Sequence, residues 1–453
     1  MKKAILLTMV LVVCAVLMCF SSTTFALTDG DWEFKLLDNK IKITDYIGEG
    51  GDVVIPETIY DCPVVEIEAN VFNSENVKSL TFPTGIKEIP TWMSDNDSLE
   101  TIIFSEGTEI IHQYAFDRCR NLKNVKLPET LKKIGGAAFE GTAITSIEIP
   151  ASVMTIGGQA FRGTNLISVD LSKSNISFGD GVFMNCKNLK TVKFHPELTQ
   201  IKPYTFEGCE ALETIEIPSS VSYIGFDAFQ DCVNLKNVIL PVNLKKIGGA
   251  AFANCDKLVE VVVPYGVETI GDGASGAFAY CDSLKSLFFP DTVTEIGGGD
   301  YSWPDNCIIY CSKNSFTEKY CKDWEISYLT DNSVNSGITV LYNGTRISFH
   351  SYGQNPELIE SRTLVPLRSI FEAMGAEVEW NGATNTAVAV RDGVKIEVQI
   401  GASEIYKNGS SIPVDVPARL INDRTMVPAR VIAEAFGADV QWNDSGRTVL
   451  ISE

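Results

Sequence analysis

One repeated stretch of sequence decides the fold of this chain. Residues 228–250 read AFQDCVNLKNVILPVNLKKIGGA, and Ala251-Phe252 then begins the same pattern again. Aligned on its phenylalanine, the pattern recurs every 22 or 23 residues from Phe116 to Phe252, and the longer step from Phe252 to Phe278 holds a small insertion. The ten marker positions are Phe72, Met93, Phe116, Phe139, Phe161, Phe183, Phe206, Phe229, Phe252 and Phe278. A fixed period of this length predicts a solenoid, because stacked units bury the apolar edge that a single unit leaves exposed.

Three apolar residues follow each marker at Leu-x-x-Val-x-Leu spacing, as in Leu235, Val238 and Leu240. The last two alternate with an outward residue, which is strand periodicity. Each unit is therefore predicted to contribute one short strand to a parallel sheet. The following proline ends that strand because it has no N–H to donate. The glycine of each Ile-Gly step is expected to permit a tight bend, and the marker phenylalanine to stack in the core.

The N-terminal segment 1–26 has the form of a secretory signal peptide. Lys2 and Lys3 precede an apolar run from Ala4 to Phe20, and a small-residue stretch ends at Ala26, after which we expect cleavage. No later run is apolar enough to span a membrane. The formal net charge of −21 argues against nucleic acid and anionic membranes as partners.

Six of the twelve cysteines form a column within the repeat. Each lies three residues after a marker: Cys119, Cys186, Cys209, Cys232, Cys255 and Cys281. Thr142, Thr164 and Asn96 occupy the same position elsewhere, so the position favours a small side chain close to backbone polar groups. We interpret the column as buried thiols, with some disulfides as the alternative in an exported chain. The column contains no Cys-x-x-Cys pair, so it does not predict a metal site.

The repeats resemble the BspA-like (Treponema-type) leucine-rich repeats of bacterial surface proteins, because Ala-Phe-x-x-Cys-x-x-Leu-x-x-Val-x-Leu-Pro recurs nearly intact. The resemblance extends from residue 27 to about 329. Ile41 to Tyr46 resembles the hairpin of an N-terminal cap, and Ile309 to Trp324 resembles a terminal turn and helix. The resemblance implies surface adhesion or protein binding and names no particular ligand.

The sheet face is the usual recognition surface of a solenoid. One outward column is small and polar. The other comprises Thr81, Ile103, Lys126, Glu148, Asp170, Lys193, Glu216, Ile239, Val262 and Phe288. We interpret the neighbouring opposite charges, Lys126/Glu148 and Asp170/Lys193/Glu216, as cross-strand pairs.

The C-terminal end of that column is apolar. We expect Ile239, Val262 and Phe288 to form an exposed strip, and contiguous exposed apolar surface often marks a contact site. The candidate ligand-binding residues are Ile239, Val262, Phe288, Asn237, Glu260 and Ser286. The alternative is that the C-terminal domain or the loop Gly297–Asn306 covers the strip.

A different repeat begins beyond residue 337. Arg362-Thr363-Leu364-Val365-Pro366-Leu367-Arg368 matches residues 424–430, and Gly375-Ala376-Glu377-Val378-Glu379-Trp380-Asn381 matches residues 437–443, at a constant offset of 62 in the numbering. In each half the proline suits the first helical position, a helix follows, the glycine suits its C-cap, and the Val-x-Trp segment alternates as a strand. A duplicated α+β domain is predicted.

Four arginines of this domain could either bind a ligand or form ion pairs within the domain. Arg362, Arg368, Arg424 and Arg430 are candidates for a ligand clamp. The interpretation that we favour pairs Arg368 with Glu372 and Arg430 with Glu434, at i, i+4 on their helices.

This segment resembles the copper amine oxidase N-terminal-like domain, which is often attached to secreted proteins of Gram-positive bacteria. The resemblance implies that the segment is a spacer or an attachment module. By analogy, the attachment would be to cell-wall polymer. Copper is bound by clustered imidazoles, and the only histidines are His112, His195 and His350. We therefore expect no metal and no cofactor.

The predicted organisation is a β-rich leucine-rich-repeat solenoid with a parallel sheet, followed by a small duplicated α+β domain. Its parts are a signal peptide (1–26), an N-terminal cap (27–70), ten leucine-rich repeats (71–296), a C-terminal cap (297–329), a linker (330–337) and the duplicated domain (338–453).

We expect a non-enzymatic protein without catalytic residues, secreted, extracellular or non-covalently attached to the cell wall. Its expected partner is an extracellular protein or glycan. The partner could belong either to the host matrix or to the cell's own wall. A structural envelope component without a specific ligand is the alternative. A hydrolase is less favoured, because no nucleophile–base pair is recognisable.

Overall fold

A computed structural model describes residues 26–72, 76–91, 96–272, 275–298, 303–304, 307–330, 338–343, 345–347, 349, 356–443 and 448–453. Several features of the sequence analysis lie outside these residues: the predicted signal peptide apart from Ala26, the marker Met93, most of the loop Gly297–Asn306, the predicted linker beyond Thr330, and His350. The chain divides into two compact units. The first extends to Leu198 and includes Lys202–Leu212, and the second comprises Thr199–Ile201 and Glu213–Glu453.

The first unit begins with a five-stranded sheet in the order β1-β2-β3-β6-β5. Its strands are β1 (Leu27–Asp29), β2 (Trp32–Leu37), β3 (Lys40–Tyr46), β5 (Thr58–Ile59) and β6 (Cys62–Ile67). The predicted hairpin is confirmed, since β2 and β3 pair antiparallel around a turn in which Asp38 and Asn39 have positive φ. Trp32 contacts the first marker, Phe72, at 6.1 Å between ring centroids, so this cap covers the exposed end of the repeats.

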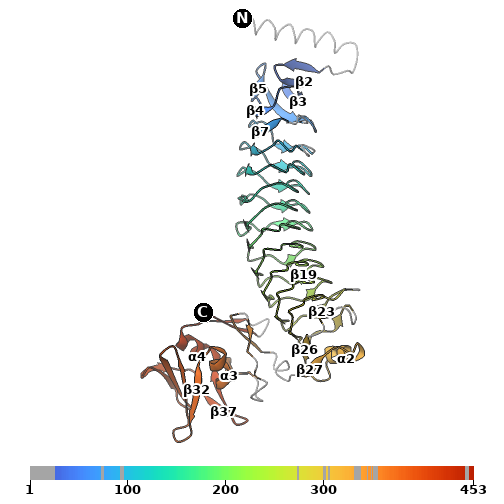
Figure 1. Ribbon diagram of the computed structural model, residues 1–453. Coiled ribbons are helices and arrows are strands. Elements are labelled where there is room, and N and C mark those ends of the chain that lie inside the picture. Colours follow the sequence, from blue (N-terminus) through green and yellow to red (C-terminus); the bar gives the residue numbers. More distant parts are fainter. Residues whose placement is uncertain are drawn as a thin grey trace. The chain divides into compact units, whose positions relative to one another are not determined.

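The predicted parallel sheet is confirmed, and its strands lie at the apolar triplets. In the first unit these triplet strands are β4 (Gly51–Val54), β7 (Val77–Thr81), β9 (Thr101–Ile103), β11 (Asn124–Lys126), β14 (Ser168–Asp170) and β16 (Thr191–Lys193). In the second they are β18 (Thr214–Glu216), β20 (Asn237–Ile239), β22 (Glu260–Val262), β24 (Ser286–Phe288), β26 (Ile308–Cys311) and β27 (Tyr328–Thr330). Equivalent residues of successive repeats face each other, as in Asn124 opposite Thr101. Figure 1 shows the strands as successive tiers within each unit.

The prediction of one strand per repeat was incomplete, because the Ile-Gly step forms a second parallel sheet. Its two-residue strands in the first unit are β8 (Glu88–Ile89), β10 (Ile110–Ile111), β12 (Lys133–Ile134), β13 (Thr155–Ile156) and β15 (Ser177–Phe178). In the second they are β17 (Gln200–Ile201), β19 (Tyr223–Ile224), β21 (Lys246–Ile247), β23 (Thr269–Ile270) and β25 (Glu295–Ile296). Such short strands carry no periodic signal, so the sequence does not distinguish them from turns.

At Gly157, Gly179 and Gly248 the glycine of the Ile-Gly step permits close approach rather than a bend, whereas Gly271 has a positive φ. Gly157 does not have a positive φ, and a Cβ built on it would lie 2.4 Å from the backbone nitrogen of Gly136 in the preceding turn. Gly179 and Gly248 stand in the same relation to the turns before them, at 2.2 and 2.4 Å. Only glycine lets consecutive turns approach this closely.

The stacking predicted for the marker phenylalanines is confirmed. From Phe116 to Phe206 in the first unit, successive rings lie 5.5–5.8 Å apart with interplanar angles of 6–17°. In the second unit, Phe252 lies 5.1 Å from Phe229 and 5.5 Å from Phe278. The turn that carries each ring contains left-handed residues on both sides, as at Gln159 and Gly163 around Phe161.

The last repeats of the second unit end in α2 (Phe316–Asp323), as the sequence predicts. The Ser315 side chain caps the helix by accepting from the Glu318 backbone N–H at 3.1 Å, and the Glu318 carboxylate accepts from the N–H of Asn314. Strand β27 then pairs parallel with β26.

The C-terminal part of the second unit is the predicted α+β domain. Its elements are β28 (Thr339–Tyr342), β29 (Thr345–Arg346), β30 (Glu357–Ile359), β31 (Arg362–Pro366), α3 (Leu367–Ala373), β32 (Glu377–Asn381), β33 (Thr386–Arg391), β34 (Val394–Gln399), β35 (Glu404–Lys407), β36 (Ser410–Pro413), β37 (Arg419–Ile421), β38 (Arg424–Pro428), α4 (Ala429–Phe436), β39 (Asp439–Asn443) and β40 (Thr448–Ser452). Pro366 and Pro428 are N-cap residues with extended ψ, one position before the predicted first helical position.

The two halves of this domain are related by an internal two-fold pairing. Strands β31 and β38 pair antiparallel with Val365 opposite Val427, its own counterpart at the offset of 62. They lie at the centre of a sheet in the order β30-β31-β38-β37. Side chains of both halves contribute to one apolar core that contains Phe371 and Ile432.

Replacing Gly157 by alanine tests the close approach of the turns. We expect Gly157→Ala to lower the midpoint of urea unfolding more than Gly163→Ala. The first substitution places a methyl group against backbone. At Gly163 (φ +66°) nothing lies closer than 3.9 Å, and only left-handed strain of about 1–2 kcal/mol opposes alanine. Equal midpoints for the two variants, measured by circular dichroism, would contradict this explanation of the glycine.

Candidate functional site

The predicted strip Ile239, Val262 and Phe288 lies on the triplet strands β20, β22 and β24 of the second unit. Ile239 is 44% exposed and Val262 is half-buried, but Phe288 is only 8% exposed. The expected exposure of Phe288 is therefore wrong. Its ring stacks on Tyr310 of β26 at 4.5 Å between centroids, with an interplanar angle of 14°.

The apolar face continues beyond the residues that the sequence analysis identified. Tyr310 lies opposite Phe288, and Leu329 of β27, 51% exposed, lies opposite Tyr310. We call Ile239, Val262, Phe288, Tyr310 and Leu329 the apolar column. The repeat pattern ends before β26 and β27, so alignment on the marker phenylalanine could not find Tyr310 and Leu329.

A polar column runs beside the apolar column and contains the other three predicted residues. Asn237 is exposed, and Glu260 and Ser286 are half-buried. The Ser286 hydroxyl donates to the Glu260 carboxylate at 3.1 Å. The second unit therefore presents apolar side chains next to hydrogen-bonding groups on adjacent strands.

The charges on the sheet face of the first unit follow the prediction only in part, since Asp170 lies opposite Lys193 on the paired strands. Glu148 accepts from Lys173 at 2.6 Å rather than from Lys126. This hydrogen bond, together with the charge of Lys173, holds the pKa of Glu148 below its ordinary value. Asp170 accepts a side-chain hydrogen bond from Ser172, which lowers the pKa of Asp170. Ser172 and Lys173, in the turn that follows Asp170, compete with the cross-strand pairs that the columns suggest.

The cysteine column has the buried, backbone-bonded environment predicted for it. Its six thiols are fully buried and are not joined in disulfides. Cys186 donates to the carbonyl of Phe161 in the preceding repeat at 3.1 Å, and Cys281 donates to that of Phe252 at 3.0 Å. Thr142 in the same position donates to the carbonyl of Phe139. The position thus selects a small donor side chain.

Of the two predicted helix ion pairs, one forms. Arg368 lies 3.7 Å from Glu372, whereas Arg430 has no ion-pair partner among the described residues. Arg362 instead pairs with Asp415, with its Nε donating at 2.6 Å, and this holds the pKa of Asp415 below its ordinary value.

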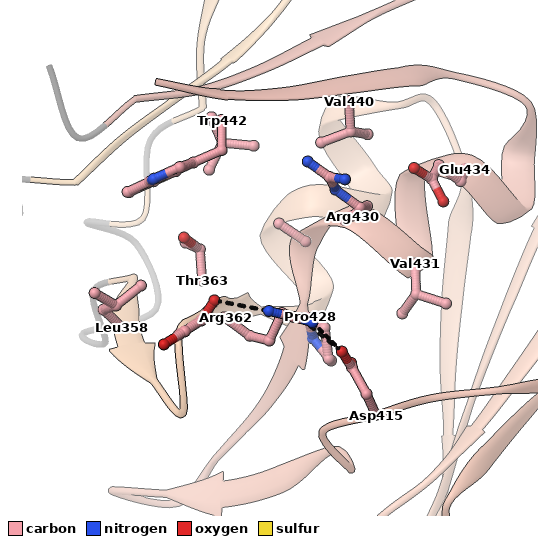
Figure 2. A pocket seen from close by; sticks show the side chains of 13 residues that line it. Leu358, Arg362, Thr363, Asp415, Pro428, Arg430, Val431, Glu434, Val440 and Trp442 are labelled. Atoms are coloured by element: carbon pink, nitrogen blue, oxygen red, sulfur yellow. Dashed lines mark hydrogen bonds and ion pairs between the residues drawn. The ribbon is translucent and has the colours of Figure 1, made fainter. Parts of the chain in front are cut away.

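Arg362 and Arg430 line a pocket of about 360 Å³ in the C-terminal domain. Figure 2 shows Trp442 and Arg430 on one side of it and Arg362 with Asp415 on the other. A second pocket of about 360 Å³ is lined by Arg368, Arg424 and Trp380. The four arginines of the candidate clamp therefore fall into two separate sites.

The described part of the chain contains no group of three metal-ligating side chains, and no helix in it is long and apolar enough to cross a membrane.

Two sequence families match the chain. The BspA type leucine rich repeat region matches residues 52–167, 154–274 and 274–341. The copper amine oxidase N-terminal domain matches residues 342–451. Neither of these is a catalytic domain.

Solved structures share the repeat fold. A leucine-rich repeat protein from Bacteroides ovatus is 18% identical, with 70% of this chain and 82% of that chain covered and a TM-score of 0.51. A leucine rich cell surface protein from Faecalibacterium prausnitzii is 22% identical, with 66% and 98% covered and a TM-score of 0.41.

Among curated proteins, one from Brevibacillus choshinensis described as a protease inhibitor is 29% identical over 99 residues. The match covers 21% of this chain and 29% of that protein, so this chain spans less than a third of the relative.

Thiol labelling tests the burial of the cysteines. Desolvation raises the pKa of Cys186 to about 11 and that of Cys307 and Cys321 to about 12. At pH 8 the thiolate fraction of such groups is on the order of one in a thousand or less. We expect a chromogenic disulfide reagent to modify only Cys62, which is half-buried, in the folded protein, and all thiols in urea. Rapid labelling of several thiols in the folded protein would overturn this view of the column.

Proposed function

Since this chain belongs to the BspA-type leucine-rich-repeat family, we propose that it is a secreted or cell-surface protein that binds an extracellular protein or glycan without catalysing a reaction. The proposed binding surface is the apolar column of the second unit together with Asn237, Glu260 and Ser286. The C-terminal domain acts as a spacer or attachment module.

The exposure of Ile239 and Leu329, at the two ends of the apolar column, carries this proposal. Exposed side chains of this size contribute free energy only when a partner removes them from water, at about 25 cal/mol per Å² of apolar surface. Phe288 and Tyr310 stack between them and make the surface rigid, so little side-chain entropy is lost when a partner binds. An apolar centre with polar groups beside it is the usual composition of a protein-binding surface.

The first unit does not repeat this arrangement. Ile103 is 47% exposed at the equivalent column position, but its neighbours across the sheet are Thr81 and Lys126. An isolated exposed isoleucine is ordinary on a protein surface, whereas apolar residues at one column position on five strands are not. This contrast favours recognition over the alternative of a purely structural envelope component.

The proposal predicts a position-specific loss of binding. Mature protein, residues 27–453, would be immobilised and exposed to host matrix proteins, mucin and purified cell wall. For whichever bait binds, we expect the Ile239→Ser/Leu329→Ser variant to lose at least about tenfold in affinity, because two apolar anchors are removed. Both side chains are exposed, so the fold should tolerate the change.

Ile103→Ser is the matched control, since it removes an equally exposed isoleucine from the same column in the first unit. It should bind as the unsubstituted protein does. An equal loss in both variants, or no loss in either, would exclude the apolar column as the binding surface.

A further inference from the structure

The two pockets of the C-terminal domain are copies of one another. Ten of the eleven residues that line the pocket around Trp380 have their counterpart, at the offset of 62, in the lining of the pocket around Trp442. We call the pocket of Arg362, Asp415, Arg430 and Trp442 pocket A, and that of Arg368, Trp380, Asp423 and Arg424 pocket B. The internal two-fold pairing of the halves places equivalent residues around both pockets.

Each pocket is built from both halves of the duplication. Pocket A takes Arg430 and Trp442 from the second half and Arg362 from the first, and pocket B is the reverse. The antiparallel pairing of β31 with β38, with Val365 opposite Val427, brings each hairpin next to the helix of the other half. A single half would therefore contain no complete pocket.

One arginine of each pocket is held in the same orientation by a local turn. Arg362 Nη1 donates to the carbonyl of Ser361 at 3.1 Å, and Arg424 Nη1 donates to that of Asp423 at 3.2 Å. Both turns contain two left-handed residues, at Glu360/Ser361 and Asn422/Asp423. The guanidinium groups are thus positioned before any ligand arrives, which lowers the entropic cost of binding.

Packing does not explain Trp380, although its counterpart Trp442 packs against the apolar core. Trp380 is 45% exposed, yet it keeps its identity with Trp442 and forms a wall of its pocket. An exposed indole presents a flat apolar face beside guanidinium groups. A pocket of this volume that combines apolar walls with a few oriented polar groups has the composition of a small-molecule site.

The charges in the pockets select among ligands. Pocket A contains the carboxylates of Asp415 and Glu434 beside its two guanidinium groups, and pocket B contains those of Glu379 and Asp423. Each lining is therefore balanced in formal charge and offers both donors and acceptors. A hydroxyl-rich neutral ring can donate to the carboxylates, accept from the arginines and lay its C–H face on the indole. A polyanion would meet two carboxylates in each site.

We propose that pockets A and B are two equivalent sites for a neutral sugar unit, which makes the C-terminal domain a bivalent module for an extracellular polysaccharide. The inference rests on the proposed function only in treating this domain as the attachment module, and it does not involve the apolar column. Two sites on one domain strengthen the hold on a polymer by effective concentration, by a factor of about 10²–10⁴ where the chain can reach both.

Titration of the mature protein with soluble oligosaccharides tests the proposal. The probes are the tetrasaccharides of β-linked glucose, β-linked N-acetylglucosamine and α-linked glucose, with poly(glycerol phosphate) as the anionic alternative. We expect at least one tetrasaccharide to bind with a stoichiometry of two by calorimetry. Its affinity should change less than about twofold between low and high salt, because the ligand is uncharged.

Substitutions then separate the pockets. Trp380→Ala should reduce the stoichiometry from two to one, and Trp380→Ala/Trp442→Ala should abolish binding. Because Trp442 is half-buried, Arg362→Gln/Arg424→Gln serves as a second test that leaves both indoles in place. Trp324→Ala removes a 46% exposed tryptophan outside the domain and should leave binding intact.

Three results would overturn the proposal: no tetrasaccharide binding at millimolar concentration, an unchanged stoichiometry in the Trp380→Ala variant, or salt-sensitive binding of poly(glycerol phosphate) alone. The Ile239→Ser/Leu329→Ser variant distinguishes the two hypotheses, since it should keep both sugar sites while losing the partner of the sheet face.

Discussion

The close parallel contact between consecutive turns is the constraint on which the repeat structure depends. At the Ile-Gly step the backbone N–H of Gly157 donates to the carbonyl of Ile134 at 2.8 Å, and that of Gly179 donates to Ile156 at the same distance. The backbone polar groups of one turn are satisfied by its neighbour, so the turns must keep a common register. Phenylalanine then lies above phenylalanine at stacking distance. The thiols of Cys186, Cys209, Cys255 and Cys281 each donate to the carbonyl of the marker phenylalanine in the preceding repeat.

This register also determines what the surface can do. Residues at equivalent positions of successive repeats form straight columns. An apolar or charged surface therefore extends over several strands only when several repeats have side chains of that kind at the same position. The first unit interrupts its outward column with charged residues, and Glu148 among them pairs with Lys173 of the next repeat. The second unit continues the apolar residues from Ile239 to Leu329 and passes from repeats into the terminal cap without a break in the column. Recognition can thus be confined to one stretch of a uniform fold.

The sequence predicted the features that recur in every repeat. It did not predict features that depend on a contact with one particular residue. The period of the marker phenylalanine predicted the parallel sheet, the ring stack and the small donor at the cysteine position, because each is imposed by repeat after repeat. The short strands at Ile-Gly were missed, since an Ile-Gly pair carries no periodicity that distinguishes strand from turn. The exposure of Phe288 was wrong because Tyr310, which covers it, lies after the repeat pattern ends. The left-handed conformation near each ring could have been predicted from the sequence. A glycine, asparagine or aspartate often follows the phenylalanine by two positions, as at Gly141, Asn185 and Asp231.

Duplication explains why the C-terminal domain could be predicted as a fold but not as a site. The constant offset between the two Arg-Thr-x-Val-Pro blocks identifies two matching halves, and matching halves suggest two self-contained lobes. Instead, Val365 pairs with its own counterpart Val427, so the halves meet along their most similar strands and exchange neighbours. A residue that is the same in both halves therefore occurs twice, once on each side of the pseudo-two-fold axis. Each copy faces residues of the other half, and several of these are also the same in both halves. Arg362 and Trp442 lie far apart in the sequence and belong to different copies, yet they line one pocket, and Arg424 and Trp380 line the other for the same reason. A duplicated domain that pairs in this way produces its sites in twos, and loss of the pairing between β31 and β38 would remove both together.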